Sequence, residues 1–470
     1  MTQSRRSTRL GEEPIAPLLI KLSLPSILAM AIQALYNVVD SIYVGHVSKD
    51  ALTALSLTFP IQMILIAIAV GTGVGTSSLI SRLLGRGEKE AAANAAEHVL
   101  IITVIYGIII AAVVVPLAHQ LINFFISDPH IVELAVNYIQ IIMLGSLALF
   151  FPMISNNILR GQGNTLLPMV TMLIGAILNI ILDPIFIFEK VNILGLHIKG
   201  LNLSVAGAAT ATVLSRFLSG LFIFFVLFSE KNELRLNFRQ FKPDLSIVKS
   251  IYQVGLPAMV MQFLGSIMLA FMNKILADFN ATAIAAGGIY FRLQSFILMP
   301  VFGLNQGYMP IVGYNYGHGN PNRMKKTMKY AFLVGFLFTT AGFALFQLFP
   351  RQLIAIFNND PQLLQIGTTA LKRISIAYPI IGPAIIASTT FQAMGRGIPS
   401  LVLSLTRQII VLVPVMYFLG RLFGLSSIWY AFPISEFVNA IVAAVWLIAV
   451  LRQVFSRLDT QQERLEYSGE

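Results

Sequence analysis

Gln33-Ala-Leu-Tyr-Asn-Val-Val-Asp40 lies inside an apolar run that extends from residue 18 to about residue 47. At helical spacing its polar side chains fall on one stripe, which holds Gln33, Tyr36, Asn37 and Asp40. A run of this length predicts a membrane-spanning helix, and a carboxylate within it is costly unless it faces a cavity, a partner or an ion. Asp40 is therefore a candidate functional residue.

The composition predicts a membrane protein built from helices. Of the 470 residues, 56% are hydrophobic and 11% are charged, with a mean hydropathy of +0.77. So few charges could not cover the surface of a soluble protein of this length. The apolar runs are long enough to cross a hydrocarbon layer of about 30 Å, and they lack the alternation of barrel strands. We expect helices, which satisfy their own backbone hydrogen bonds in lipid.

The distribution of charge predicts an orientation in the membrane. Most of the 32 Lys and Arg residues lie in short loops on one side of the predicted spans, which places both termini in the cytoplasm of a multi-pass cell (inner) membrane protein. The net charge of +11 does not indicate nucleic-acid binding, because the basic residues form no single patch. The absence of cysteine excludes disulfides and thiol chemistry.

Twelve spans are predicted. They cover residues 17–45, 51–80, 93–116, 131–156, 165–188, 204–228, 247–276, 282–311, 328–349, 366–392, 399–420 and 428–451.

An internal repeat divides these spans into two halves. A shift of 232 residues superimposes Pro25 on Pro257, Gly71 on Gly303, Gly75 on Gly307 and Asp128-Pro129 on Asp360-Pro361. Slightly different offsets bring Gly163 onto Gly397 and Ser215 onto Ser435. Each half holds six spans, an even number, so both halves begin on the same side and are related by a pseudo-twofold axis along the membrane normal. The predicted fold is an all-α polytopic membrane protein with an N-lobe (1–228), a linker (229–246) and a C-lobe (247–470) that ends in a short polar tail.

The repeat fails at the acidic residues of the first half. Asp40 falls on Met272, and Asp183 falls on Val413. Asn179 precedes Asp183 by four residues, so the two share a helical face. Two structural interpretations are open: the acids are neutralised or hydrogen-bonded for helix packing, or Asp183 merely ends the fifth span at the outer surface. The functional interpretation is a site that takes up a proton near neutral pH or binds a hard monovalent cation through oxygen ligands.

Other polar and sulfur-containing residues receive weaker assignments. Arg216 and Glu436 follow the matching serines and are interpreted as packing residues, with a relay role as the alternative for Glu436; Arg407 is placed in an inner loop. Met259 and Met272 are candidates for an adaptable wall that contacts apolar ligands, with lipid contact or packing as the alternative.

These motifs together resemble the multidrug and toxic compound extrusion family. The resemblance is carried by Leu24-Pro25, Tyr36-Asn37-Val-Val-Asp40, Gly71-Thr-Gly-Val-Gly75, Arg160-Gly-Gln-Gly163, Asn179-Ile-Ile-Leu-Asp183-Pro184, Gly207-Ala-Ala-Thr-Ala-Thr212 and Pro433-Ile-Ser-Glu436. In the branch with an acidic N-lobe, it implies a cation site, which is a metal site only if the ion is Na⁺. The implied ligands are Asp40, Asn179, Asp183 and Thr212, with Thr210 competing for the last place. It further implies that Gln33, Tyr36, Asn37 and Asn156 or Asn157 line the same cavity.

The expected function is secondary active export of lipophilic, often cationic compounds in exchange for H⁺ or Na⁺, by a monomer in the lipid bilayer without a further cofactor. The nearest alternative is a flippase for lipid-linked saccharides, which would need a cation-rich cavity for the pyrophosphate group. A membrane-embedded enzyme is the third alternative, but no paired catalytic residues within one motif support it.

Overall fold

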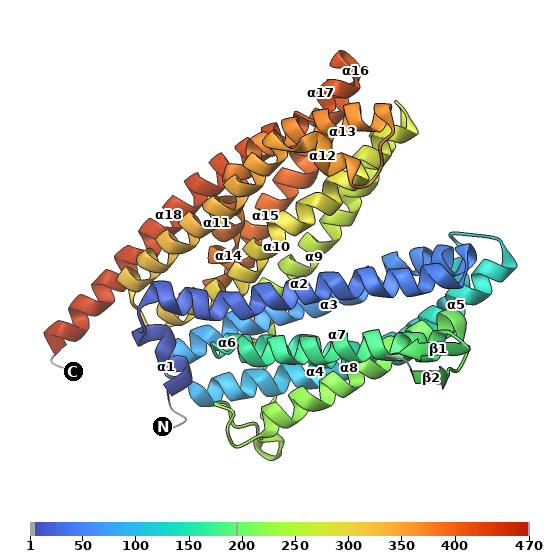
Figure 1. The fold of residues 1–470 in the computed structure, drawn as a ribbon. Helices are drawn as coiled ribbons and strands as arrows, with labels where there is room; N and C mark the ends of the chain where they lie inside the picture. Colours follow the sequence, from blue (N-terminus) through green and yellow to red (C-terminus); the bar gives the residue numbers. More distant parts are fainter. Residues whose placement is uncertain (1–4, 194–195, 469–470) are drawn as a thin grey trace.

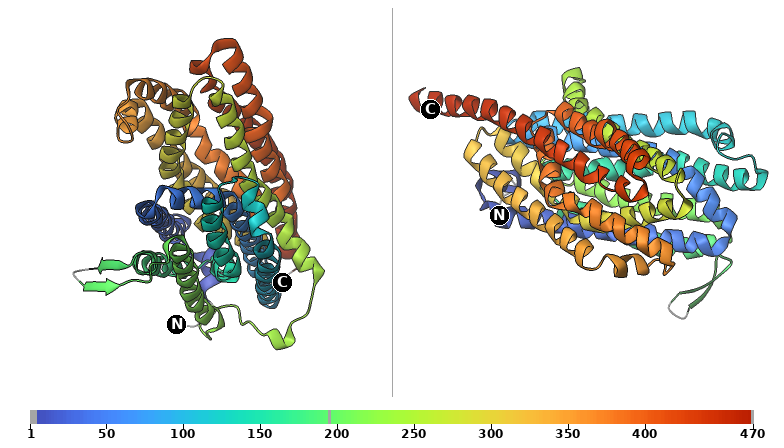
Figure 2. Two further views of the ribbon diagram at one scale, coloured as in Figure 1. Left: turned by 90° about the vertical axis from the view of Figure 1, so that its right-hand side faces the viewer. Right: turned by 90° about the horizontal axis from the view of Figure 1, so that it is seen from above.

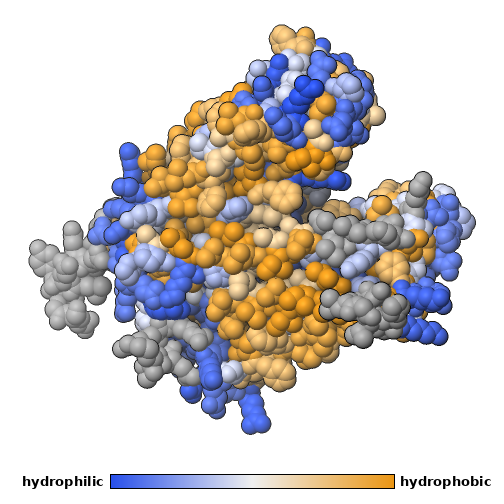
Figure 3. Space-filling view, in the orientation of Figure 1, coloured by the Kyte–Doolittle hydropathy of each residue, from blue (hydrophilic) through white to orange (hydrophobic). Residues whose placement is uncertain are grey.

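The computed structural model describes residues 5–193 and 196–468, apart from the side chains of residues 5–6, 37–42, 45–46, 49, 192–193, 196–198, 240 and 459–468. In this part of the chain, eleven helices or helix pairs are long and apolar enough to cross a membrane. A twelfth span is formed by α5 (Pro129–Leu144) and α6 (Ser146–Gly161), which meet at a bend of 50°. The predicted all-α membrane fold with twelve spans is confirmed, and a broad apolar belt separates two polar ends (Figure 3).

The helices form two bundles that correspond to the two halves of the sequence (Figure 1). The N-lobe holds α2 (Ile15–Val47), α3 (Lys49–Gly85), α4 (Lys89–Asn123), α5, α6, α7 (Leu166–Ile187) and α8 (Ser204–Phe228). The C-lobe holds α9 (Leu245–Ala277), α10 (Ala281–Gly317), α11 (Pro321–Leu348), α12 (Pro350–Ala355), α13 (Pro361–Ile374), η2 (Ser375–Ala377), α14 (Tyr378–Ala393), α15 (Gly397–Leu405), η3 (Thr406–Val411), α16 (Leu412–Phe423), α17 (Leu425–Ile428) and α18 (Ala431–Ser468). Both termini lie on one side, which we call the terminal side, and the bundles diverge toward the opposite, open side (Figures 1 and 2).

The repeated turn residues build equivalent helix ends in the two lobes. Asp128 and Asp360 each cap a helix whose first residue is proline, and their carboxylates accept backbone N–H groups at 2.9 Å and 2.8 Å. Gly163 and Gly395 both end a helix with positive φ, +76° and +80°. The structure therefore matches Gly163 with Gly395 at the common shift of 232, and the predicted match with Gly397 is wrong.

The two lobes touch through glycines that the repeat carries from one lobe to the other. Gly75 of α3 faces α9, where an added Cβ would lie 2.1 Å from the carbonyl oxygen of Ile251. Its repeat mate Gly307 of α10 faces α2, where an added Cβ would lie 2.7 Å from the backbone nitrogen of Ser23. Because no side chain fits at such distances, the glycines allow the helix backbones to approach closely. Gly71 and Gly75 therefore serve the close packing of α3 against α9.

A second pair of glycines marks the position of the pseudo-twofold axis. Gly85 lies against the carbonyl of Tyr314, and Gly317 lies against the carbonyl of Arg82, with an added Cβ at 2.0 Å and 2.1 Å. The shift of 232 residues converts one contact into the other, since it carries Gly85 to Gly317 and Arg82 to Tyr314. The pseudo-twofold rotation therefore maps the contact of α3 with α10 onto itself, which places the axis between these two helices.

A short N-terminal helix covers this contact on the terminal side. The helix α1 (Arg5–Glu12) buries Leu10, whose carbonyl accepts hydrogen bonds from Asn315 Nδ2 at 2.9 Å and Arg323 Nη2 at 3.1 Å. Ser7 donates its backbone N–H to Glu233 Oε2 of the linker at 3.0 Å. The helix α1 therefore joins the C-lobe to the linker that leaves the N-lobe.

The linker is itself fixed to α4. Glu97 accepts the backbone N–H of Asn237 at 2.6 Å, and His98 Nε2 accepts that of Asp244 at 2.8 Å. Between these residues lies η1 (Phe238–Gln240), one turn of 3₁₀ helix. The linker thus packs along the N-lobe before α9 begins.

The sequence did not predict two elements of the structure. The polar tail is helical, because α18 continues to Ser468 through residues that favour helix and extend an existing one. An antiparallel hairpin joins α7 to α8 on the open side, with β1 (Lys190–Ile193) paired to β2 (Leu196–Lys199) in the register Lys190 to Lys199. Two strands of four residues each are too short to stand out in a sequence dominated by long apolar runs.

Candidate functional site

A buried polar cluster lies between α7 and α8 of the N-lobe. Asn179 Nδ2 donates to Asp183 Oδ1 at 3.0 Å and contacts Thr212 Oγ1 at 3.4 Å. The exposed fractions are 1% for Asn179, 0% for Asp183 and 8% for Thr212. The structure therefore brings together three of the four residues that the family resemblance implied as a cation site.

Small residues on the two helices make this approach possible. An added Cβ at Gly207 of α8 would lie 2.4 Å from the carbonyl oxygen of Phe186, and one at Gly175 of α7 would lie 3.3 Å from Ser219 Oγ. Close contact of α7 with α8 then places Thr212 beside Asn179. Thr210 instead donates to the carbonyl of Ala206 in its own helix at 2.8 Å, so Thr212 is the one of the two threonines that contacts Asn179.

Asp183 does not end its helix at the surface. The helix α7 continues through Pro184 to Ile187, and the Asp183 side chain is fully buried within the lobe. The interpretation of Asp183 as an outer-surface residue is therefore wrong. A carboxylate at this depth requires compensation by hydrogen bonds, a proton or a cation.

The stripe on α2 meets a basic residue of α8. Arg216 Nη2 donates to Gln33 Oε1 at 3.4 Å, and the guanidinium lies 5.5 Å from the centre of the Tyr36 ring. Arg216 follows Thr212 by one helical turn, so this contact lies next to the polar cluster. Asn37 and Asp40 belong to α2, but their side chains lie outside the described residues.

The remaining predicted cavity residues occupy packing positions. Asn156 is 5% exposed, and Asn157 donates to the carbonyl of Met153 at 2.9 Å while its amide lies against Gly73 of α3. Met259 packs against Gly71 in the contact between the lobes, and Met272 lies in the C-lobe core. In this conformation neither methionine lies on an open wall.

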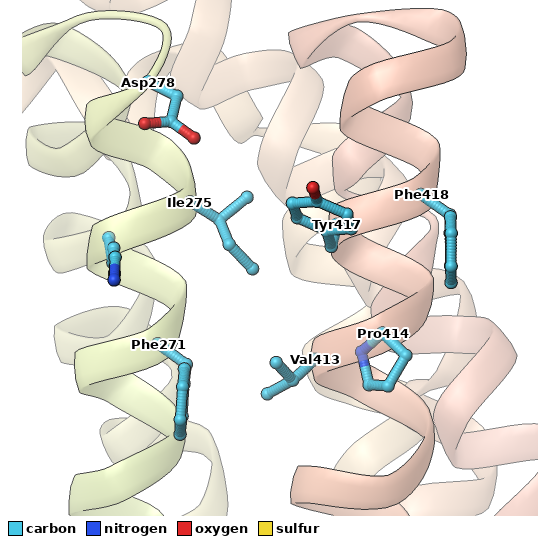
Figure 4. Close-up of a pocket in the computed structure, with 8 residues that line it drawn as sticks. Phe271, Ile275, Asp278, Val413, Pro414, Tyr417 and Phe418 are labelled. Atoms are coloured by element: carbon cyan, nitrogen blue, oxygen red, sulfur yellow. The ribbon is translucent and has the colours of Figure 1, made fainter.

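In the C-lobe a cavity of about 340 Å³ lies between α9 and α16, and its lining is apolar apart from Lys274 and Asp278. Ile275, Val413 and Tyr417 point into the gap between the two helices (Figure 4). The repeat places Val413 on Asp183 and Pro414 on Pro184. The kink-forming proline is thus shared, while the carboxylate of the N-lobe is replaced by a hydrocarbon side chain.

The C-lobe has an ion pair in a different place. Arg407 Nη1 lies 3.5 Å from Glu436 Oε1, and the two side chains are 30% and 13% exposed. Arg407 lies ten residues beyond Gly397, where its span begins, which corresponds to about 15 Å along a helix. The assignment of Arg407 to an inner loop is therefore wrong, and the packing assignment of Glu436 missed its charged partner.

The N-lobe cluster has the chemistry of a site for a proton or a hard monovalent cation. It offers a carboxylate, an amide and a hydroxyl, all oxygen ligands. The Asn179 Oδ1 atom is buried and has no hydrogen-bond partner among the described residues. An amide oxygen in this position suits coordination of a cation better than packing, because a buried acceptor without a partner is destabilising.

Comparison with known proteins identifies relatives over nearly the whole chain. The family model MatE matches residues 25–185 and 257–418, one match in each lobe. The multidrug export protein MepA of Staphylococcus haemolyticus (strain JCSC1435) is 29% identical over 434 residues, 92% of this chain and 93% of that protein.

Solved structures show the same fold. A structure described as MATE in the bent conformation gives a TM-score of 0.90 at 30% identity, covering 97% of this chain and 99% of that one. A MOP superfamily transporter from Pyrococcus furiosus, described as having a binding pocket of reverse polarity that suggests a different function, gives a TM-score of 0.89 at 30% identity with the same coverage.

Proposed function

The chain belongs to the MatE family of membrane transporters, and from this premise we propose that it is a secondary active multidrug exporter. It exchanges lipophilic, often cationic compounds for H⁺ or Na⁺ by alternating access. The observation that carries the proposal is the buried cluster of Asn179, Asp183 and Thr212 between two membrane-spanning helices. The name of the MepA relative supports drugs as the substrate class.

The coupling ion binds in the N-lobe. Asp183, Asn179 and Thr212 supply oxygens. Asp40, which the family resemblance adds as a fourth ligand, belongs to α2, the helix that packs against α7. The ion neutralises the carboxylates, and α2 then repacks near Pro25, which interrupts its hydrogen-bond ladder. Repacking shrinks the N-lobe cavity and weakens drug binding, so the ion and the drug favour different states of the same lobe.

The shape of the molecule supports an outward-facing state. The terminal side, where the lobes meet and α1 covers them, is assigned to the cytoplasm, and the open side faces outward (Figure 1). A monomer is sufficient because the two lobes form the transport path. Each unit charge that moves down about 100 mV supplies about 2.3 kcal/mol, which drives a bound drug outward.

Drug susceptibility in a bacterial host without its own pumps tests the function. The wild-type chain should protect against ethidium, whereas Asp183→Asn and Asp40→Asn should abolish protection at equal expression. Val413→Ala is the matched control in the C-lobe. If both aspartate variants protect as well as wild type, the carboxylates are structural. Vesicles with imposed H⁺ or Na⁺ gradients then identify the coupling ion.

A flippase for lipid-linked saccharides is the second candidate, because Arg216 places a cation next to the N-lobe cluster. The Pyrococcus furiosus relative with a reversed pocket polarity gives a precedent within the same fold. Absence of drug protection, together with gradient-driven movement of a fluorescent pyrophosphate lipid in vesicles, would favour this candidate.

A further inference from the structure

The C-lobe holds an intramembrane acid that the proposed coupling site does not use. Glu436 of α18 pairs with Arg407 through one contact of 3.5 Å, although Arg and a carboxylate can form two shorter bonds. The second oxygen, Glu436 Oε2, is buried and has no hydrogen-bond partner among the described residues. The pair is therefore only half satisfied.

Two tyrosine hydroxyls complete a polar pocket around Glu436. Tyr290 of α10 and Tyr378 of α14 are 1% and 0% exposed, and among the described residues no hydrogen bond joins either hydroxyl to Glu436 or Arg407. Both tyrosines interact electrostatically with Glu436 and with each other. Among the described residues, the titratable groups that face Glu436 are these two tyrosines and Arg407. Glu436 Oε2 therefore has no hydrogen-bond donor among the described residues, although two hydroxyls interact with its charge. A buried carboxylate oxygen without a donor indicates a missing proton or water.

The backbone at this place departs from a regular helix. Residues Thr406–Val411 form a π-helical turn, and the carbonyl of Arg407 accepts the hydroxyl of Ser435, the residue before Glu436. Turns of this kind leave carbonyls free and recur at functional sites. The hydrogen bond ties α18 to η3 beside the ion pair, so a shift between these elements changes the distance from Glu436 to Arg407.

The pocket is not a copy of the N-lobe site. The offset that matches Ser215 with Ser435 places Arg216 at the position of Glu436, and the offset that matches Asp183 with Val413 places Ile177 at that of Arg407. The acid is on the last span, so the pocket has no acidic equivalent in the first half. A packing role shared by both lobes does not explain it.

We propose that Glu436 is a second proton-binding group, located in the C-lobe, and that it exchanges its proton during the transport cycle; this inference rests on the proposed exporter function. A proton from the outer aqueous side adds to the free oxygen of Glu436, and no other bond breaks. The Tyr290 and Tyr378 hydroxyls supply its hydrogen-bond partners. Arg407 then loses its counter-charge, which favours the state in which the guanidinium reaches water. In that state the proton leaves to the other side and the pair re-forms.

Proteoliposomes that hold the full chain test the proposal. At an imposed gradient of one pH unit, we measure the ratio of the ethidium concentrations on the two sides of the membrane at which the net flux of ethidium stops. Loss of one coupled proton lowers this ratio about tenfold, because each proton contributes one factor of ten per pH unit. We expect this fall in Glu436→Gln and in the double variant Arg407→Met with Glu436→Met, and no change in Glu189→Gln, which removes an exposed carboxylate.

The double variant separates a proton site from a structural ion pair. An apolar pair of similar size replaces a buried ion pair without loss of folding, so a purely structural role predicts full recovery of the wild-type ratio. That recovery would overturn the proposal. The double variant also keeps the test valid where Glu436→Gln alone fails to fold.

Infrared difference spectra give a readout that needs no transport. Acidification of the wild-type protein should produce a carboxylic acid band that persists in Asp183→Asn and is lost in Glu436→Gln. If that band is equally strong in Glu436→Gln, Glu436 does not bind the proton. A wild-type protein that exports nothing but shows the Glu436 band would overturn the exporter function and keep the proton site.

Discussion

The N-lobe and the C-lobe meet through repeated glycines, yet Asp183 of the first lobe stands where the second has Val413. Gly75 and Gly307 face equivalent helices across the contact, whereas the buried cluster of Asn179 and Asp183 occurs in the N-lobe alone. A side chain at either glycine would collide with a backbone, so both copies are held to one residue type. Polar residues inside a lobe carry no such constraint, and each half could acquire its own chemistry.

The largest predicted effect comes from making the N-lobe resemble the C-lobe. Asp183→Val copies Val413 and removes the coupling carboxylate. At about 100 mV the loss of one coupled charge lowers drug accumulation about 50-fold. Folding should persist, because the Asn179 amide that loses Asp183 keeps its contact with Thr212 Oγ1 at 3.4 Å. The measurement is gradient-driven ethidium uptake in inside-out vesicles.

Two further results decide how this experiment is interpreted. Val413→Ala, the matched control, should change uptake by less than about twofold. Full coupling in Asp183→Val would mean that the difference between the lobes at this position has no role in transport.

The shared glycines supply the next effect. Gly75→Ala and Gly307→Ala each place a Cβ at less than 3 Å from the backbone of the opposite lobe. Each should destabilise the lobe contact by about 2 kcal/mol, which lowers the Tm in thermal unfolding in detergent. The two variants should lose the same amount, because the contacts are related by the pseudo-twofold axis.

Gly288→Ala provides the control within α10, since no atom lies within 4 Å of the added Cβ. If the Tm falls by different amounts in Gly75→Ala and Gly307→Ala, the two contacts differ in energy although the pseudo-twofold axis relates their positions.

The sequence predicted well what depends on local spacing. Asn179 and Asp183 share a face because they are four residues apart on one helix, and Gly75 matches Gly307 because the repeat is regular. The pair of Arg407 and Glu436 was missed because it joins different spans, and only tertiary packing sets how those spans face each other. Arg407 lies ten residues after the start of its span, and this spacing alone could have shown that it lies within the membrane. Thr212 was placed beside Asn179 by the family resemblance, since the intervening hairpin hides its register.

A smaller effect should follow from an arginine that breaks the symmetry of the terminal side. Arg323 binds the carbonyls of Leu10 and Glu13 at 3.1 Å and 2.8 Å, whereas its repeat mate is Ala91. Arg323→Met removes these bonds. Because water replaces them in the open state, their net contribution is about 1 kcal/mol, and their loss should favour opening of the terminal side. The chain has no cysteine, so Ser23→Cys provides a unique thiol at the lobe contact.

Thiol labelling measures that opening. Labelling of Ser23→Cys from the terminal side should rise about fivefold when Arg323→Met is added, which corresponds to about 1 kcal/mol. Lys326→Met, which removes another basic residue of α11, is the control. Equal labelling in all three proteins would mean that α1 does not hold the lobes closed.

The smallest effect concerns how the first helix of each lobe begins. Asp244 caps α9 by accepting the backbone N–H of Ser246 at 2.8 Å, whereas α2 begins at Pro14 without a side-chain cap. Hydrogen bonds from the Ser246 side chain and backbone hold the pKa of the Asp244 carboxyl below its usual value of 3.8. The folded state thus prefers the charged carboxylate, and this stabilisation is complete at neutral pH and is lost as the pH falls below that value. Asp244→Ala should lower the Tm by about 1 °C at pH 7 and by less near pH 3.

Asp244→Asn, which has an uncharged side chain that also caps helices well, is the control. It should keep most of the wild-type Tm and show no pH dependence. If Asp244→Ala lowers the Tm equally at both pH values, the charge of the cap does not contribute.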